Sequence, residues 1–330
     1  MKVTVTGIQP TGSLHLGNYL GMIQPALALA EQYEALYFIA DYHALTSMRS
    51  GKDIRDLTYE VAATWLALGL DPARSILYRQ SDVPEVTELA WILDCVTSKG
   101  LMNRAHAYKA AVAENRQHDR DPDTGVNLGL YTYPVLMAAD ILFPGAHVVP
   151  VGLDQRQHIE IAQDIAEAFN ASYGSVLTLP EALIDERVMT IPGIDGRKMS
   201  KSYGNASPIL KPTEVLRKAV MRIKTDSRRP EEPKDPETDV IFQLFRHIAP
   251  PAAVDSMAER YRSGRVSYAE TKQELFQTLN VRFAVPRERY QQTVADRQAI
   301  DGILKDGAER VRAIGTPILS RVRTAIGVGG

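Results

Sequence analysis

The sequence contains almost no cysteine and no long apolar run. Cys95 is the single cysteine among 330 residues, which excludes disulfides within the chain and any cysteine-rich zinc or iron–sulfur site. No stretch approaches the roughly 20 apolar residues of a membrane span. The N-terminus, MKVTVTGIQPTG, has proline and glycine where a signal peptide has its apolar run. We therefore expect a cytoplasmic protein with no membrane partner.

The net charge of −2 conceals an uneven distribution of charge along the chain. Residues 1–210 carry 16 Lys/Arg and 24 Asp/Glu, whereas residues 211–330 carry 22 and 16. A basic second part favours contact with a polyanion. A charged surface that is merely solvated has the same composition, so charge alone leaves both interpretations open.

The first half of the chain alternates apolar strand-like runs with helical periodicity. Strands are expected at 2–6, 35–41, 75–80 and 146–152. Helices are expected at 17–32, 53–69, 84–98, 128–142 and 154–169, with a kink at Pro25. This alternation predicts an α/β fold with a doubly wound parallel sheet, whose ligands bind beyond the carboxyl ends of the strands.

After about residue 207 the strand signal fades and the periodicity becomes helical. Two polar segments, 115–127 and the proline-broken 226–239, are expected to be surface loops. We therefore expect two domains, an α/β domain over residues 1–207 and an all-helical domain over 208–330. The last helix of the second domain is expected to pack back on the first.

A glycine-rich segment, TGIQPTGSLHLGNYLG at 6–21, follows the first strand and precedes the first helix. Gly17 and Asn18 stand where the helix begins, so free backbone N–H groups there would attract an anion. His15 lies just before them, placed to donate a hydrogen bond to a phosphate. The pattern suits a nucleoside triphosphate, but a histidine that only packs or caps the helix would fit so short a motif as well.

A second segment, RKMSKSYGN at 197–205, is a polar loop after the last strand. Lys198 and Lys201 lie there among small residues, and such a loop can place two ammonium groups on a polyphosphate. A solvated basic turn is the simpler explanation when this segment is considered alone.

Together the two segments resemble the paired signature sequences of class I aminoacyl-tRNA synthetases. Their order, their spacing and the predicted fold agree with that family. Asn18 stands where the more common H-I-G-H form has its second histidine, a departure frequent in the tyrosyl and tryptophanyl branches. The resemblance implies a Rossmann-like catalytic domain over 1–207, a tRNA-binding helical domain over 208–330, and a homodimer.

A third segment, YTYPVLMAADIL at 131–142, lies on an expected helix. Tyr133, Met137 and Asp140 share one face of it. The segment resembles the amino-acid-selecting helix of the tyrosyl/tryptophanyl subclass, where tyrosyl enzymes usually have glutamine at the position of Met137. An adaptable apolar Met137 suits an indole ring, and Asp140 is then free to accept the indole N–H. The alternative is that Tyr133 and Met137 are core residues and Asp140 a surface charge, although an aspartate among Met, Ala and Ile is unusual on a surface.

Further stretches extend the resemblance to the tryptophanyl branch over most of the chain: DYHALT at 41–46, VPVGLDQRQHIE at 149–160 and AERVRAIG at 308–315. The resemblance implies that catalysis involves His15, Asn18, Lys198 and Lys201. The implied ATP site comprises Gln9, Pro10, Thr11, Gly17, Asn18, Gly152, Leu153, Asp154, Val188, Lys198, Met199, Ser200, Lys201 and Ser202. The implied L-tryptophan site comprises Val5, Gly7, His43, Tyr133, Met137, Asp140 and Gln155. Asp154 would serve equally well as the N-cap of the helix at 154–169.

The resemblance also implies two chemical steps, in which ATP activates tryptophan as an adenylate and tRNA(Trp) then takes the aminoacyl group. The phosphates would hold Mg²⁺, so no resident metal, zinc or iron–sulfur cluster is expected. Arg217, Arg222 and Arg228 would bind the anticodon end of the tRNA.

Three alternatives remain: a tyrosyl-tRNA synthetase, a small-molecule nucleotidyltransferase, and a non-catalytic relative that senses tryptophan or binds RNA. Met137 argues against the first of these. The 197–205 loop, followed by a basic helical domain, argues against the second. The presence of His15, Lys198 and Lys201 argues against the third.

Overall fold

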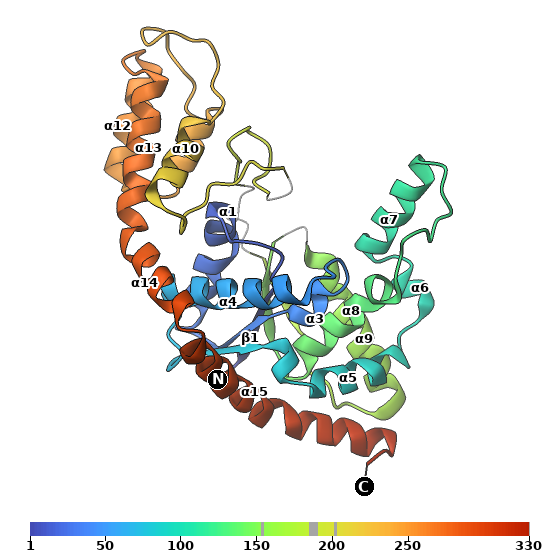
Figure 1. Cartoon of the computed structure of the whole chain (residues 1–330). Helices are drawn as coiled ribbons and strands as arrows, with labels where there is room; N and C mark the ends of the chain where they lie inside the picture. The colour runs from blue at the N-terminus through green and yellow to red at the C-terminus, as the bar shows by residue number, and fades with distance from the viewer. Residues whose placement is uncertain (153–154, 185–190, 201–202, 330) are drawn as a thin grey trace.

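A five-stranded parallel sheet organises the first 184 residues of the chain (Figure 1). The computed structural model describes residues 1–152, 155–184, 191–200 and 203–329. The strands are β1 (Val3–Ile8), β2 (Glu34–Ile39), β3 (Ile76–Arg79), β4 (Val148–Val151) and β5 (Glu181–Ile184). Their order is β3-β2-β1-β4-β5, with every neighbouring pair parallel. The order reverses between β1 and β4, where sheets of this kind open a crevice for a ligand.

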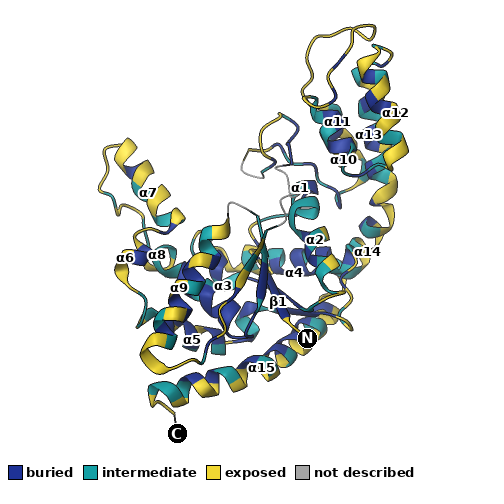
Figure 2. Ribbon diagram, turned by 180° about the vertical axis from the view of Figure 1, so that it is seen from behind, coloured by how far each residue is buried: buried dark blue, intermediate teal, exposed yellow. Residues whose placement is uncertain are grey.

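Helices cover both faces of this sheet (Figures 1 and 2). The helices are α4 (Gly51–Ala67) on one face, and α5 (Glu85–Asp94), α8 (Leu128–Leu142) and α9 (Arg156–Tyr173) on the other. Successive side chains of a strand point to opposite faces. Accordingly, Leu36 and Phe38 of β2 pack with α5, α8 and α9, whereas Tyr37 and Ile39 pack with α4. The predicted doubly wound α/β fold is confirmed.

The first predicted helix, 17–32, is interrupted. It consists of α1 (Leu16–Asn18), a π-helical turn (Tyr19–Ile23) and α2 (Gln24–Leu29). Pro25 has no backbone N–H and cannot continue a regular hydrogen-bond ladder. The wider π turn, in which the Gln24 N–H donates to the Tyr19 carbonyl, stands just before it.

Some elements were absent from the sequence prediction. They are α3 (Asp41–Ala44), α6 (Lys99–Met102), α7 (His106–Gln117) and β5. The prediction of a loop over 115–127 is wrong at its start, because α7 continues to Gln117. Figure 1 shows α7 projecting from the body of the molecule. The Asn115 side chain donates to the carbonyls of Pro122 and Thr124 and so ties the following loop to the helix end.

In the described part of the chain after β5, the elements are helices, apart from an isolated antiparallel bridge between Pro192 and Lys198. They are α10 (Thr213–Met221), α11 (Val240–Phe245), α12 (Pro251–Arg262), α13 (Tyr268–Arg282), α14 (Ala284–Ala295) and α15 (Arg297–Ile326). Apolar residues of α10 to α13 form a cluster that also includes Leu16, Ile191, Ile194 and Met199. This packing crosses residue 207, so the division at that residue stays a prediction.

The long helix α15 returns to the sheet and runs along its β3 edge (Figures 1 and 2). Gly307 allows a close approach, since a Cβ there would lie 1.9 Å from the carbonyl oxygen of Leu77. Ion pairs of Arg297 with Asp56 and of Arg323 with Glu88 hold the two ends of the helix. The helix thereby covers the otherwise exposed edge of the sheet. Among the described residues, no helix is both long and apolar enough to traverse a lipid bilayer.

Candidate active site

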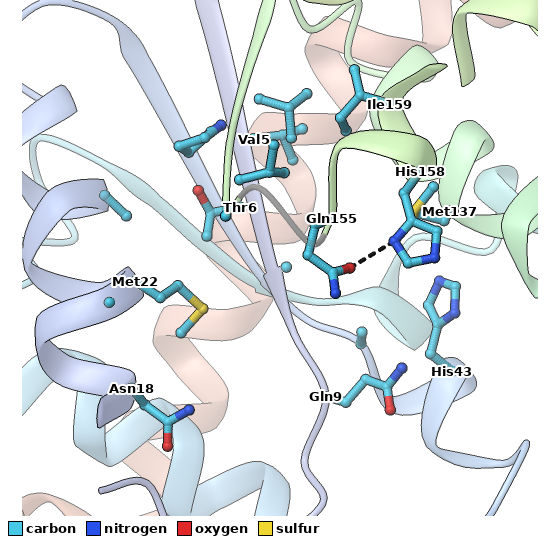
Figure 3. A pocket seen from close by; sticks show the side chains of 18 of the residues that line it. Val5, Thr6, Gln9, Asn18, Met22, His43, Met137, Gln155, His158 and Ile159 are labelled. Atoms are coloured by element: carbon cyan, nitrogen blue, oxygen red, sulfur yellow. Dashed lines mark hydrogen bonds between the residues drawn. The ribbon is translucent and has the colours of Figure 1, made fainter. Parts of the chain in front are cut away.

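A pocket of about 1060 Å³ opens at the carboxyl ends of β1 and β4 (Figure 3). Both signature segments, α8 and the start of α9 contribute to its wall. The predicted site residues that line it are Val5, Gly7, Gln9, His15, Gly17, Asn18, His43, Tyr133, Met137, Gly152, Gln155, Lys198 and Met199. Segments far apart in the sequence therefore meet at the edge of the sheet where this fold binds ligands.

Other predicted site residues lie elsewhere. Pro10, Thr11, Ser200 and Asp140 do not belong to the pocket lining; Pro10 is buried and Thr11 is exposed. Five more lie outside the described residues: Leu153, Asp154, Val188, Lys201 and Ser202.

The start of α1 is closed by a reciprocal pair of side chains. Nδ1 of His15 accepts the Asn18 N–H at 3.4 Å, and Oδ1 of Asn18 accepts the His15 N–H at 3.1 Å, which is a capping box. The Gly17 N–H donates to Sδ of Met199 at 3.3 Å. The expectation of free backbone N–H groups at Gly17 and Asn18 is therefore wrong, because side chains already accept both. An anion in the pocket would instead meet lining side chains such as those of Asn18 and Lys198.

The two signature segments are joined directly. Besides the contact between Gly17 and Met199, the Leu16 N–H donates to the carbonyl of Ser207 at 3.0 Å. Leu16 and Met199 are buried in the same apolar cluster as α10 and α11. The segment around Lys198 is thus packed against the helix start on one side and the C-terminal helices on the other.

The buried side chain of Asn205 organises this segment. Its amide donates to Oδ1 of Asp195 at 2.7 Å and to the Lys198 carbonyl at 3.1 Å, and it accepts the Ser200 N–H at 2.8 Å. The bond from Asn205, together with Arg197, lowers the pKa of Asp195 to about 2. Gly193 leaves the necessary space, since a Cβ there would lie 2.3 Å from the Asn205 amide. Asp195, Lys198 and Ser200 are therefore held together by one buried side chain.

Tyr133, Met137 and Asp140 lie on one helix, α8, as predicted, but they differ in whether they reach the pocket. Tyr133 and Met137 line the pocket, whereas Asp140 is 1% exposed and lies outside the lining. Oδ2 of Asp140 is 2.9 Å from Nε2 of His43, and Nε2 of Gln80 donates to both carboxylate oxygens at 2.9 Å. The burial expected for Asp140 is found, but its carboxylate is not free. It stands behind His43, which does line the pocket.

A hydrogen-bonded chain connects α8 to the start of α9. The Tyr133 hydroxyl is 2.8 Å from Nε2 of His158. Nδ1 of His158 is 2.6 Å from Oε1 of Gln155, the hydrogen bond drawn in Figure 3. An amide oxygen can only accept, so His158 donates from Nδ1 to Gln155. Burial raises the pKa of Tyr133, which keeps its phenol protonated. The chain orients two side chains that face the pocket, Tyr133 and Gln155.

The three predicted tRNA-binding arginines lie on or after α10, outside this pocket. All three are exposed. The Arg217 guanidinium lies 5.9 Å from the centre of the Phe276 ring. Arg228 forms an ion pair with Asp226 at 3.3 Å and donates to the carbonyl of Pro233. Arg228 is therefore partly committed to its own loop.

Sequence reasoning missed two residues that shape the site, Gln80 and Asn205. Gln80 follows β3 at the carboxyl edge of the sheet, and that position was its only available signal. Asn205 belongs to a segment already singled out, but nothing in the local pattern indicates a buried asparagine.

Comparison with known proteins agrees with this geometry. A model of the family described as tRNA synthetases class I (W and Y) matches residues 2–284. The chain belongs to this family of class I aminoacyl-tRNA synthetases. It is an aminoacyl-tRNA ligase by class, as the sequence predicted.

Its similarity is to the tryptophan members of the family. The tryptophan–tRNA ligase of Xanthomonas campestris pv. campestris is 50% identical over 328 residues, covering 98% of this chain and 76% of the relative. That of Neisseria meningitidis is 47% identical over 330 residues, covering 99% and 98%. The crystal structure of tryptophanyl-tRNA synthetase from Campylobacter jejuni complexed with ADP and tryptophan has a TM-score of 0.90 and 40% identity. It covers 99% of this chain and 100% of that chain.

Proposed function

We propose that this chain is a tryptophan–tRNA ligase. It activates L-tryptophan with ATP and transfers it to the 3′ end of tRNA(Trp), releasing AMP and pyrophosphate. One observation carries this proposal: a single pocket is lined by His15, Asn18 and Lys198 together with Met137 and His43. Figure 3 shows Asn18 on the opposite side of the pocket from Met137 and His43, which leaves room for a nucleotide beside an amino acid.

The chemistry of the first step requires positioning more than proton transfer. A carboxylate is already ionised at neutral pH, so its attack on the α-phosphate needs no general base. The barrier lies in aligning the two reactants and in spreading the negative charge that develops on pyrophosphate. Lys198 and Lys201 would supply positive charge there, and the side chains of His15 and Asn18 would orient the phosphates.

Magnesium would enter with the nucleotide. Among the described residues no group of three or more His, Cys, Asp or Glu side chains could hold a metal ion. The phosphates of ATP would therefore supply most of the ligands, as is usual for Mg²⁺ in nucleotide sites. Gln9, Gly17, Gly152, Lys198 and Met199 line the pocket and are placed to contact the nucleotide.

The other side of the pocket fits tryptophan. Val5 and Gly7 lie on β1, and a Cβ on Gly7 would lie 2.3 Å from the Phe38 ring, so glycine keeps β1 and this ring in contact. Met137 offers an apolar surface to the indole ring. Tyr133 and Gln155, held through His158, would bind the α-amino group. The buried pair of Asp140 and His43 would supply the acceptor for the indole N–H.

The remaining surface supports proposals for the second substrate and for the assembly. The exposed arginines 217, 222 and 228 would meet the anticodon end of the tRNA. Trp91 is 70% exposed, and it lines a groove together with Leu45 and Leu136. Burial of Trp91 and the rest of this groove against a second copy would form a homodimer. A cytoplasmic location fits these substrates.

The proposal is tested by aminoacylation of purified transcripts. With ATP and Mg²⁺ present, the protein should attach tryptophan to tRNA(Trp) and release one AMP for each amino acid attached. The matched control is tRNA(Tyr) with tyrosine, which should remain uncharged. Charging of tRNA(Tyr) with tyrosine in place of the tryptophan reaction would overturn the proposal.

A further inference from the structure

Gln80 is a buried glutamine that none of the pocket's apparent chemistry requires. It is the first residue of a 3₁₀ turn that follows β3 (Gln80–Asp82), and its exposed fraction is 0%. An amide buried this completely is costly unless its nitrogen and its oxygen both find partners. At Gln80 both ends do.

The partners fix the orientation of this amide. Its nitrogen donates to Oδ1 and Oδ2 of Asp140 at 2.9 Å each, and its oxygen accepts the Tyr42 N–H at 3.1 Å. A carboxylate only accepts and a backbone N–H only donates, so a flipped amide would lose these contacts. Gln80 thereby connects the start of α3, the end of β3 and helix α8.

The three elements so connected surround one side of the pocket. Asp140 is also bonded to Nε2 of His43, and His43 lines the pocket on α3. Two of the three hydrogen bonds that the described structure gives to the Asp140 carboxylate come from Gln80. Without the two bonds from Gln80, only His43 would bond to the Asp140 carboxylate, and the orientation of this buried group would no longer be fixed.

We propose that Gln80 is a positioning residue for amino-acid selection, which acts by fixing the Asp140 carboxylate behind His43. The inference rests on the proposed function, because it assumes that the Asp140–His43 pair accepts the indole N–H of tryptophan. Gln80 does not touch the substrate. It keeps the Asp140–His43 pair in place to accept the indole N–H. If this acceptor were lost, the site would no longer bind tryptophan better than an analogue without the N–H.

The test compares tryptophan with 3-benzothienylalanine, which has sulfur in place of the indole N–H and nearly the same shape. Pyrophosphate exchange is measured with each amino acid for the wild type and for Gln80→Met, an apolar substitution of similar length. Hydrogen bonds to charged groups are the stronger kind, so the preference for tryptophan should fall by about 10–100-fold in the variant. The loss should appear as a higher KM for tryptophan, with the KM for ATP and the reaction of the analogue near wild type.

A purely structural role would give a different result. If Gln80 only filled the core, Gln80→Met would slow the reactions of both amino acids equally and leave their ratio unchanged, which would overturn the inference. Gln243→Leu is the control, because it removes an amide on α11 that donates to the carbonyl of Glu237, away from the pocket. It should leave the ratio at the wild-type value. If Gln80→Met does not fold, Gln80→Asn, whose amide is too short to reach Asp140, should lower the ratio as well, and an unchanged ratio there is equally decisive.

The outcomes also separate this inference from the function on which it rests. A wild-type protein that activates no tryptophan would contradict the proposed function itself. A wild type that prefers tryptophan over the analogue, with a Gln80 variant that keeps this preference, would overturn only the role of Gln80.

Discussion

The backbone N–H of Gly17 donates to Sδ of Met199 at 3.3 Å, although the two residues are 182 positions apart. A Cβ on Gly17 would lie 3.3 Å from Cβ of Met199, so glycine keeps this approach open. The contact joins the two segments that the sequence singled out separately. The position of Lys198, next to Met199, therefore depends on the helix start at His15.

Met199→Leu should test this connection. Leucine keeps the apolar volume, and such exchanges usually cost less than about 1.5 kcal/mol of stability. It removes the sulfur acceptor, which is a weak one, so the loss should lie near the lower end of the about 0.5–1.5 kcal/mol of an ordinary hydrogen bond. We expect adenylation to slow by about 2–3-fold, with a raised KM for ATP and an unchanged KM for tryptophan. Met257→Leu, in the core of the C-terminal helices, is the control and should leave both KM values alone.

Asp140 should control both tryptophan selection and its pH dependence. Burial raises the pKa of the Asp140 carboxyl above its ordinary value, bonds from His43 and Gln80 oppose this rise, and the charge of Asp41 adds to it. Only the ionised form offers its full set of acceptors, so the KM for tryptophan should rise as pH falls through this raised pKa. Asp140→Ala should lose most tryptophan activation and the preference over phenylalanine.

The control for this effect is Asp140→Asn, which cannot titrate. Its KM for tryptophan should be high and independent of pH in the acid range, measured by pyrophosphate exchange at constant ATP saturation. A wild-type KM for tryptophan that stayed flat with falling pH would speak against Asp140 as part of the acceptor. If Asp140→Ala still preferred tryptophan over phenylalanine as the wild type does, Asp140 would have no role in selecting the amino acid.

The basic stretch after residue 210 should serve tRNA and not the first step. With Arg217, Arg222 and Arg228 changed to Gln, the KM for tRNA should rise, whereas tryptophan-dependent pyrophosphate exchange should stay near wild type. Each lost single-stranded phosphate contact should also reduce the log–log salt slope of binding by about 0.7. Because Arg228 is paired with Asp226, it should contribute less than the other two.

A control for this experiment lies on α15. Lys305 and Arg321 are exposed there, and changing both to Gln removes positive charge without touching α10. The KM for tRNA should then change little. Normal charging of tRNA by the triple arginine variant would contradict this assignment, and residues 260–297 would be the next segment to test.

Helix α15 should be sensitive to a single methyl group at one glycine and tolerant at another. Gly307→Ala would place Cβ 1.9 Å from the Leu77 carbonyl oxygen, and overpacking of this kind costs about 1–3 kcal/mol. Gly302→Ala on the same helix meets nothing within 4 Å and should stabilise by about 0.4–1 kcal/mol. Thermal unfolding of both variants measures the difference. Equal Tm values for the two variants would contradict the close contact between Gly307 of α15 and Leu77 of β3.

The fold was predictable where the signal is local. β2 and β4 are apolar runs, α8 is a long and mostly apolar segment, and α9 has clear helical periodicity, so their existence needs no knowledge of distant residues. β5 was missed because EALI is only four residues long and its positions are exposed or half-buried, so its signal is short and weak. α7 was missed because its composition is polar and its one buried residue is Asn115.

The sequence predicted the segments that form the site, but not the hydrogen bonds that connect them. His15, Lys198, Tyr133 and Met137 were found because their segments have recognisable patterns. The role of Gln80 depends on a partner 60 positions away, and that of Asn205 depends on how one loop folds back on itself. The expectation of free N–H groups at α1 failed for the same reason, since the acceptor for the Gly17 N–H comes from another segment.

The most direct test of the proposed activity is pyrophosphate exchange by the purified protein with each of the twenty amino acids in turn. Tryptophan should support exchange, and a site that bonds the indole N–H should discriminate against phenylalanine by up to ~10⁴–10⁵. Tyrosine should be a poor substrate because Met137 offers its hydroxyl no partner. Exchange that is fastest with tyrosine, or that is absent with all twenty amino acids, would contradict the identification of this pocket as a tryptophan-activating site.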